Sequence, residues 1–172
     1  MIETPRLILR PWRASDGDAF AAMNAHPEVM ADLGGPLDRP GSDAKLARFT
    51  KSFGDHALTR WVIEDRATGV FLGYAGLAWR DASHALGEHY DIGWRLTRAA
   101  WGKGYASEAA AAALQDAFGR AGLKEVFAYT APDNLRSQAV MARLGLERSP
   151  SHDFTWPEGE GAWRGLVWIA RP

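Results

Sequence analysis

Residues 101–108, with the sequence WGKGYASE, carry the most informative chemistry of the chain. Gly102 and Gly104 free the backbone to turn tightly and to approach a ligand closely. An alanine-rich run at residues 109–113 follows directly and favours a helix, whose first amides have no partner inside the helix. Because such a helix start attracts anions, the segment predicts a site for a phosphate group.

The elements around this loop leave two interpretations open. Residues 90–96 read as a strand with a glycine inside it, so a strand delivers the Gly-x-Gly loop into a helix. A plain strand-to-helix connector has the same pattern, and spacing alone does not separate it from a phosphate site. Two other nucleotide motifs are excluded. Lys103 lies between the glycines rather than before Ser or Thr as in a Walker loop, and a dinucleotide fingerprint is not completed.

A second unit lies downstream. Residues 126–130 are rich in strand formers, residues 132–134 (Pro-Asp-Asn) are turn chemistry, and residues 137–144 have helical spacing that stops at Gly145. Together the two units resemble the GNAT superfamily of acetyl-CoA-dependent N-acetyltransferases, and specifically its RimJ/RimL-like branch, whose best-known members acetylate protein N termini. The resemblance rests on DIGW at 91–94, WGKGYASEA at 101–109, the Asn134-x-x-Ser137 pair and LGL at 144–146, with TPRLILR at 4–10 and GVFLGYAGL at 69–77. It is weakest at residues 33–57 and after Ser149.

The resemblance implies an α/β (α+β) GNAT fold in a single domain over residues 1–172: a central mixed, mostly antiparallel sheet, flanked by helices and splayed at the acetyl-CoA strand. Periodicity and turn residues predict matching elements. The expected strands are 7–9, 60–64, 71–77, 90–96, 126–130 and 166–170, and the expected helices are 14–23, 43–53, 105–121 and 137–144, with a loop at 34–42.

The resemblance also implies which residues bind acetyl-CoA. Backbone groups of one strand would pair with the pantetheine arm like an added strand, and an amide there would polarise the thioester oxygen. Lys103 is equally well explained as a solvated loop lysine. The implied coenzyme residues are Trp94, Arg95, Leu96, Trp101, Gly102, Lys103, Gly104, Tyr105, Ala106, Ser107, Glu108, Asn134 and Ser137.

Catalytic roles are implied for Ser137 and Asp91. Ser137 would protonate the leaving thiolate, or cap the helix, or do both. Asn134 would contact pantetheine or form an Asx turn. A tyrosine acid found seven residues after this asparagine in many relatives is excluded here, because that position is Met141. Asp91 is the first candidate for the general base, and a structural strand-end carboxylate is equally consistent with its position.

Other residues enter the chemistry less directly. Glu88 and His89 are the next candidates for the base. Asp153, Glu158 and Glu160, near Trp156 and Trp163 in a Gly/Pro-rich loop, would form a negative rim at the acceptor mouth, or would only solubilise the surface.

Composition excludes several classes of protein and of functional site. The chain has 172 residues, five histidines without metal-ligand spacing, and no cysteine, which excludes disulfides and a cysteine acyl-enzyme. A formal net charge of -1 gives no general attraction to nucleic acid or anionic membrane. No apolar run reaches membrane-spanning length. From these observations we expect a cytoplasmic protein without a metal, nucleic-acid or membrane partner. We expect it to be a monomer or a homodimer.

The expected activity is therefore transfer of an acetyl group from acetyl-CoA to a primary amine by direct attack. The acceptor is a protein N terminus or, alternatively, a small amine such as a polyamine, an amino acid or an aminoglycoside-like drug. A different class, a GNAT-fold protein that binds acyl-CoA without turnover, is disfavoured because Ser137 and Asn134 are both present.

Overall fold

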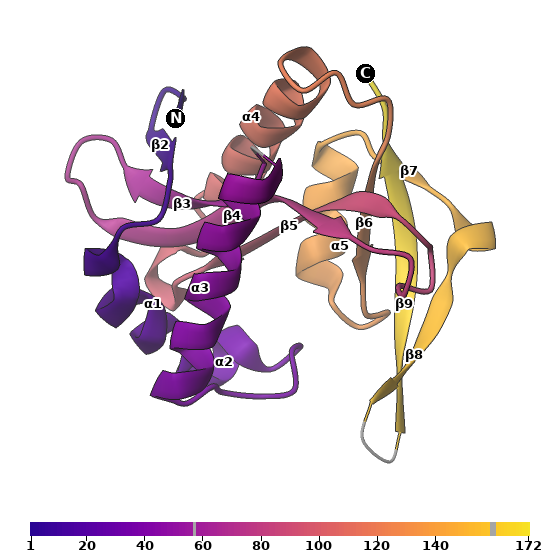
Figure 1. Ribbon diagram of the computed structural model, residues 1–172, viewed down its shortest axis with the longest axis horizontal. Helices are drawn as coiled ribbons and strands as arrows, with labels where there is room; N and C mark the ends of the chain where they lie inside the picture. The colour runs from indigo at the N-terminus through magenta and orange to yellow at the C-terminus, as the bar shows by residue number, and fades with distance from the viewer. Residues whose placement is uncertain (57, 159–160) are drawn as a thin grey trace.

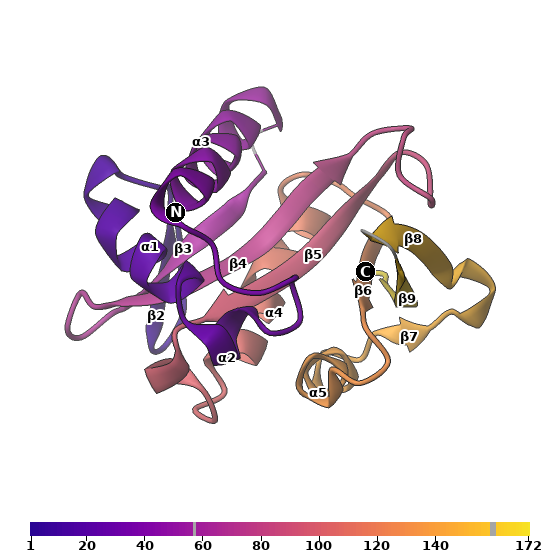
Figure 2. The ribbon, with the colours of Figure 1, turned by 90° about the horizontal axis from the view of Figure 1, so that it is seen from below.

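The computed structural model describes residues 1–56, 58–158 and 161–172, and over these residues nine strands form one mixed sheet with helices on both faces (Figures 1 and 2). The spatial order is β1-β2-β3-β4-β5-β6-β9-β7, and β8 pairs with β9. The strands are β1 Ile2–Glu3, β2 Leu7–Arg10, β3 Arg60–Asp65, β4 Phe71–Arg80, β5 His89–Leu96, β6 Val126–Thr130, β7 Glu147–Arg148, β8 Phe154–Glu158 and β9 Gly161–Ala170.

The helices divide between the two faces of the sheet. Helices α1 (Gly17–Asn24) and α3 (Arg39–His56) cover one face, while α4 (Tyr105–Gly119) and α5 (Leu135–Arg143) cover the other (Figure 2). The short α2 (Pro27–Met30) lies beside α1. Alanine side chains let α4 approach the sheet closely, because they are small. Four of them are fully buried: Ala109, Ala110, Ala113 and Ala117.

One pair of strands departs from the antiparallel pattern. β5 and β6 run parallel, and their register contains a single pair, Asp91 opposite Phe127. β5 pairs with β4 along its whole length, from His89 to Leu96. Beyond Asp91, therefore, one edge of β5 has no partner in β6. This confirms the predicted fold class, a mostly antiparallel sheet that is splayed at this strand.

Several predicted boundaries were wrong. The second helix runs from Arg39 to His56, so Pro40-Gly41-Ser42 belongs to its first turn rather than to a loop. Proline is tolerated in a first turn, and the carboxylate of Asp38 accepts the Gly41 amide at 2.8 Å. The final strand begins at Gly161, and its hairpin partner β8 was not predicted because Pro157 and the nearby glycines suggested a loop.

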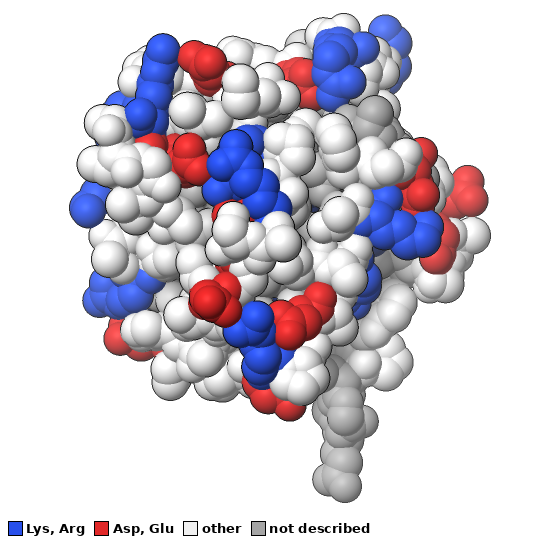
Figure 3. Space-filling view, turned by 60° about the vertical axis from the view of Figure 1, so that its left-hand side comes forward, with Lys and Arg blue, Asp and Glu red and all other residues white. Residues whose placement is uncertain are grey.

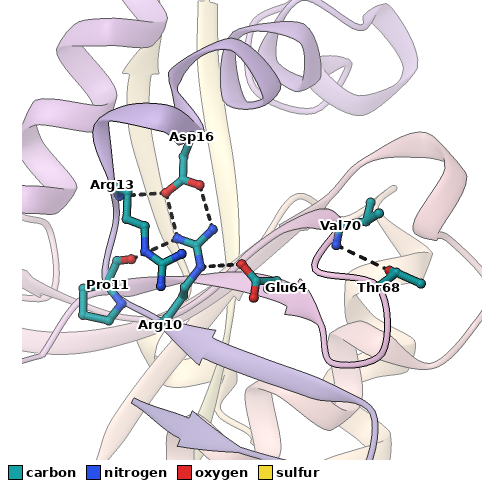
Figure 4. A network of polar contacts seen from close by, with 7 residues as sticks. All are labelled: Arg10, Pro11, Arg13, Asp16, Glu64, Thr68 and Val70. Carbon is teal, nitrogen blue, oxygen red and sulfur yellow. Dashed lines mark hydrogen bonds and ion pairs between the residues drawn. The ribbon is translucent and has the colours of Figure 1, made fainter.

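Arg10 ties β2 to its neighbours through a buried ion-pair network (Figure 4). Its guanidinium donates to Asp16 at 2.7 and 2.8 Å and to Glu64 at 2.6 Å. The Arg10 and Asp16 side chains are only 6% and 5% exposed. Burial alone would raise the pKa of Asp16, but the hydrogen bonds from Arg10 and the Arg13 amide lower it below its ordinary value. The network therefore fixes the turn before α1 against the β2–β3 pair.

Removing one member of this network should destabilise the fold. Asp16→Asn leaves a buried, partly unpaired arginine, and we expect the free energy of unfolding to fall by about 3 kcal/mol. The matched control is Asp18→Asn, because Asp18 also pairs with an arginine, Arg39, but its side chain is 89% exposed. Urea unfolding of both variants checks this: equal stability of the two would show that the buried network contributes little.

Candidate functional site

A large cleft opens where β5 and β6 diverge. Its volume is about 1530 Å³, larger than the roughly 300–1,000 Å³ of a drug-sized ligand site. It brings together most of the residues proposed from the sequence. These lining residues are Trp94, Arg95, Leu96, Trp101, Gly102, Lys103, Gly104, Tyr105, Ala106, Ser107, Asn134 and Ser137.

The N terminus of α4 opens into this cleft without a cap. Gly102 and Gly104 adopt left-handed backbone angles, with φ of 75° and 79°, which favour glycine. Gly104 occupies the N-cap position and makes no side-chain cap hydrogen bond, so the first amides of α4 are left for a ligand. The Ser107 hydroxyl is buried and has no hydrogen-bond partner among the described residues. This arrangement fits a phosphate group.

Positive side chains also line the cleft. Lys103, Arg136 and Arg143 contribute cations, and the Arg136 guanidinium lies 4.1 Å from the centre of the Trp101 ring. These three cations are grouped at the cleft. On the face drawn in Figure 3, basic and acidic side chains are interspersed, and neither sign forms a continuous patch. The three cations are therefore placed where a phosphorylated ligand would meet them.

Glu108 is the one predicted coenzyme residue that does not line the cleft. Its carboxylate accepts the Thr4 hydroxyl at 2.6 Å and the Arg6 Nε at 2.7 Å. Burial alone would raise the pKa of Glu108, but these hydrogen bonds lower it below its ordinary value. Glu108 thus anchors the first turn of α4 to the start of the chain, which differs from the direct contact expected.

Asn134 and Ser137 meet at the start of α5. The Asn134 side-chain oxygen accepts the Ser137 backbone amide at 3.1 Å, so the asparagine, not the serine, caps the helix. Both residues line the cleft. Asn134 is therefore the N-cap of α5, bonded to an amide three residues on rather than two as in an Asx turn, and the Ser137 hydroxyl is not needed as the helix cap.

Asp32 is a cleft residue that sequence reasoning missed. It follows α2 and accepts hydrogen bonds from Arg95 on β5 and from Asn134 before α5. Its partners are 63 and 102 residues away, and no local pattern announces such a contact. Only the fold brings these three side chains together.

Asp91 lies below the surface, away from the residues that line the cleft. It is 3% exposed, and its carboxylate contacts the guanidinium groups of Arg60 and Arg80, the latter at 2.6 Å. Burial alone would raise the pKa of Asp91, but the charges of Arg60 and Arg80 lower it below its ordinary value. A doubly paired carboxylate is a poor proton acceptor. Of the two interpretations left open by the sequence, this environment favours the structural carboxylate over the general base.

Gly93 explains how Arg60 reaches this carboxylate. A Cβ atom at Gly93 would lie 3.0 Å from Arg60 Nη2, so a larger residue would displace the guanidinium. Arg60 also donates to the backbone oxygens of Gly76 and Asp91. The glycine inside β5 therefore allows close approach of an arginine side chain, and the ion pair holds β3, β4 and β5 together at the point of divergence.

The other two candidates for the base are placed differently from each other. Glu88 is exposed on the loop before β5. His89 is 6% exposed; its Nδ1 pairs with the Gly87 oxygen at 2.8 Å, while its Nε2 is buried without a hydrogen-bond partner among the described residues. Neither residue lines the cleft.

Aromatic side chains from the β4–β5 loop, β6 and the β8–β9 hairpin pack together next to the cleft, and we call this cluster the aromatic wall. His84 stacks on Tyr129 and on Trp156, and Tyr129 contacts Trp163, which lines the cleft. Burial, followed by the charges of His89 and Arg80, lowers the pKa of His84, so its ring is neutral at physiological pH.

The expected negative rim is only partly described. Asp153 is not a free carboxylate, because it accepts Arg148 at 2.6 Å and the Val167 amide at 3.0 Å. Glu160 lies outside the described residues, and the side chain of Glu158 is likewise not described. Among the described residues, no group of three or more His, Asp or Glu is placed to hold a metal ion, and no helix is long and apolar enough to cross a membrane.

Comparison with known proteins identifies the class. Residues 6–147 match the acetyltransferase (GNAT) domain family, and the chain belongs to this family. It is 33% identical over 168 residues to an uncharacterized N-acetyltransferase, YnaD, of Bacillus subtilis, covering 94% of this chain and 91% of the relative.

Solved structures agree with this assignment. An acetyltransferase from Agrobacterium tumefaciens is 27% identical and superimposes with a TM-score of 0.84, over 99% of this chain and 94% of that one. RimJ of Mycobacterium smegmatis, solved with CoA-disulfide, shares the fold at 21% identity and a TM-score of 0.74, over 96% and 81% of the two chains. The chain is thus an acyltransferase by family, with a fold that binds coenzyme A in a neighbour.

The Asp91 ion pairs give a pH-dependent stability. Because the pKa of Asp91 is lowered on folding, its contribution is present above its ordinary value near 3.8 and is lost as the pH falls through the lower folded-state value. We expect Asp91→Asn to lower the free energy of unfolding by about 3 kcal/mol at pH 7, and this difference to shrink below about pH 4. Urea unfolding across this pH range checks it.

The control for Asp91→Asn is Glu88→Gln, which removes an exposed carboxylate immediately before β5. It should leave stability unchanged at both pH values. A difference between wild type and Asp91→Asn that does not vary with pH would contradict the ion-pair account.

Proposed function

We propose that this protein is an N-acetyltransferase that moves the acetyl group of acetyl-CoA to a primary amine by direct attack in a ternary complex. One observation carries the proposal: an uncapped helix start, flanked by two left-handed glycines, opens into a large cleft beside the unpaired edge of β5. Membership of the GNAT family supports acetyl transfer in general. The remaining assignments follow from the geometry of this chain.

The phosphate end of the coenzyme would lie at the start of α4. Amides of Tyr105, Ala106 and Ser107 would donate to the diphosphate, with the Ser107 hydroxyl as a further donor. Lys103 and Arg136 would add charge from the two sides of the cleft. Glu108 supports this loop from behind through Arg6.

The pantetheine arm would complete the sheet. Beyond Asp91 the free edge of β5 carries backbone groups of Trp94 and Leu96, because those of Arg95 between them face Tyr74 on β4. The Leu96 oxygen accepts Trp101 Nε1 at 3.1 Å, and the remaining groups need a partner when they are buried. An extended amide-containing arm supplies the matching donors and acceptors, as in strand addition. One amide of this edge would then stabilise the negative charge that develops on the thioester oxygen.

The chemistry needs two proton movements. The amine nitrogen forms a bond to the carbonyl carbon, the carbon–sulfur bond breaks, and the amine loses one proton while the thiolate gains one. Ser137 lines the cleft and does not cap α5, so its hydroxyl would supply the proton to sulfur. We propose that water accepts the amine proton, since Asp91 is doubly paired, and that Asp91 instead keeps Arg60 in place beneath the coenzyme strand.

The proposed acceptor is a protein N terminus, as in the RimJ/RimL-like branch, with a small-molecule amine as the alternative. RimJ as a structural neighbour supports the branch. The aromatic wall of His84, Tyr129 and Trp163 would face the acceptor. A non-catalytic acyl-CoA-binding protein is the competing class.

An amine panel separates these alternatives. Thiol release from acetyl-CoA should rise above the rate without amine when the right acceptor is present, either short peptides with free N termini or polyamines, amino acids and aminoglycosides. Ser137→Ala should lower kcat by about tenfold, because general acid help to a thiol leaving group is modest. Binding of coenzyme A without thiol release from any amine would favour the non-catalytic class.

The diphosphate loop gives the sharpest test of coenzyme binding. Gly104→Val should raise the Kd for coenzyme A by about a hundredfold, because a side chain there opposes the left-handed backbone and obstructs approach to the helix start. Gly122→Val is the matched control: Gly122 also has a positive φ, 66°, but lies after α4, outside the cleft lining. Calorimetric titration of both variants checks this, and equal affinities would remove the assigned phosphate site.

A further inference from the structure

Asp32 joins the two walls of the cleft. Its Oδ1 accepts Arg95 Nη1 at 2.6 Å, and its Oδ2 accepts Arg95 Nη2 at 3.2 Å and Asn134 Nδ2 at 2.6 Å. Arg95 belongs to β5, Asn134 lies between β6 and α5, and Asp32 comes from the loop after α2. One carboxylate thus binds both sides of the opening that β5 and β6 leave beyond Asp91.

This contact sets the orientation of the Asn134 amide. The side-chain oxygen of Asn134 accepts the Ser137 amide, and its nitrogen donates to Asp32. In the opposite orientation, the Asn134 oxygen would face the Asp32 carboxylate and the NH₂ group would face the Ser137 backbone N–H, so neither hydrogen bond could form. A side-chain amide has two N–H donors. With one donor used by Asp32, the second remains for a ligand in the cleft that Asn134 lines.

Asp32 also neutralises Arg95. The Arg95 side chain is 12% exposed, donates to the Val29 oxygen, and has an Nε that is buried without a hydrogen-bond partner among the described residues. A buried guanidinium without its carboxylate is unfavourable and would shift toward solvent. That movement would disturb β5 between Trp94 and Leu96, whose backbone groups face the free edge.

We propose that Asp32 is a positioning residue for the coenzyme: it holds the Asn134 amide donor and the β5 edge in the arrangement that receives the pantetheine arm. The inference rests on the proposed function. It assigns to the loop after α2 a role in coenzyme binding that acts through Arg95 and Asn134 rather than through direct contact.

The test measures the Kd for coenzyme A by calorimetry in four variants: Asp32→Ala, Asp32→Asn, Asn134→Ala and the Asp32→Ala/Asn134→Ala double variant. Asp32→Ala should weaken binding about tenfold, the effect of losing a hydrogen bond to a charged group. Asp32→Asn should weaken binding measurably but less than Asp32→Ala, because its oxygen still accepts from Asn134 while its neutral amide no longer offsets the charge of Arg95. If Asp32 acts through Asn134, the Kd of the double variant should be no higher than the higher of the two single-variant Kd values. Independent effects would instead multiply, to a Kd about a hundredfold above that of the wild type.

The matched control is Asp18→Ala. Asp18 pairs with Arg39, both side chains are largely exposed, 89% and 56%, and neither residue lines the cleft. It should leave the Kd unchanged. The urea midpoint of each variant identifies unfolding, and Asp32→Asn, which keeps the shape of the side chain, carries the test if Asp32→Ala does not fold.

The outcomes are distinct. Wild-type protein that does not bind coenzyme A overturns the proposed function. Wild-type binding together with unchanged affinity in folded Asp32→Ala, or in Asp32→Asn where only that variant folds, overturns the role of Asp32 alone. Losses that multiply in the double variant show that Asp32 acts independently of Asn134, which also overturns the inference.

Discussion

The rest of the site depends on the separation of two neighbouring strands after one pair. β5 and β6 meet at Asp91 and Phe127, and the described register goes no further. Backbone donors and acceptors that lose a strand partner must find another when they are shielded from water. The edge of β5 beyond this pair therefore lacks a strand partner in β6, and a ligand with regularly spaced amides is chemically suited to pair with it. The helix start to which we assign the phosphate lies at the same cleft.

A sheet that opens in this way needs reinforcement at the point of opening. The buried ion pairs of Asp91 with Arg60 and Arg80 lie at this point. Arg60 reaches across β4 to β5 because Gly93 leaves room for its guanidinium. Buried ion pairs contribute little net stability compared with apolar packing, yet breaking one is costly. Their value here is geometric, since they resist any register in which β5 shifts relative to β3 and β4.

The sequence predicted the residues that line the proposed coenzyme cleft far better than those of the proposed acceptor side. The glycine-rich loop, the strand before it and the Asn134–Ser137 pair follow local rules of backbone conformation, so nearby residues announce them. The role of Asp91 stayed open because spacing cannot tell a carboxylate at the cleft from one buried between two arginines. Arg60 and Arg80 are 31 and 11 residues away from it along the chain.

Asp32 and the β8–β9 hairpin escaped prediction for related reasons. The contacts of Asp32 exist only after three separate elements have packed together, and its own neighbours in the sequence indicate a glycine-containing turn and nothing more. The hairpin contains Pro157 and several glycines, which are loop formers, but its strands are fixed by pairing with each other from Phe154 with Gly165 to Glu158 with Gly161. Tertiary pairing overrides local propensity at such positions.

This difference has a physical origin that bears on specificity. Coenzyme A presents the same phosphates and amides to every enzyme that uses it, so backbone groups and a few glycines suffice to bind it. An acceptor is distinguished by its own shape and charge, and side chains from separate elements must converge on it. In the proposed function those elements are the β4–β5 loop with His84, β6 with Tyr129 and the β8–β9 hairpin with Trp163. Substitutions in these three elements can alter the acceptor while leaving the helix start, the β5 edge and the ion pairs beneath it unchanged.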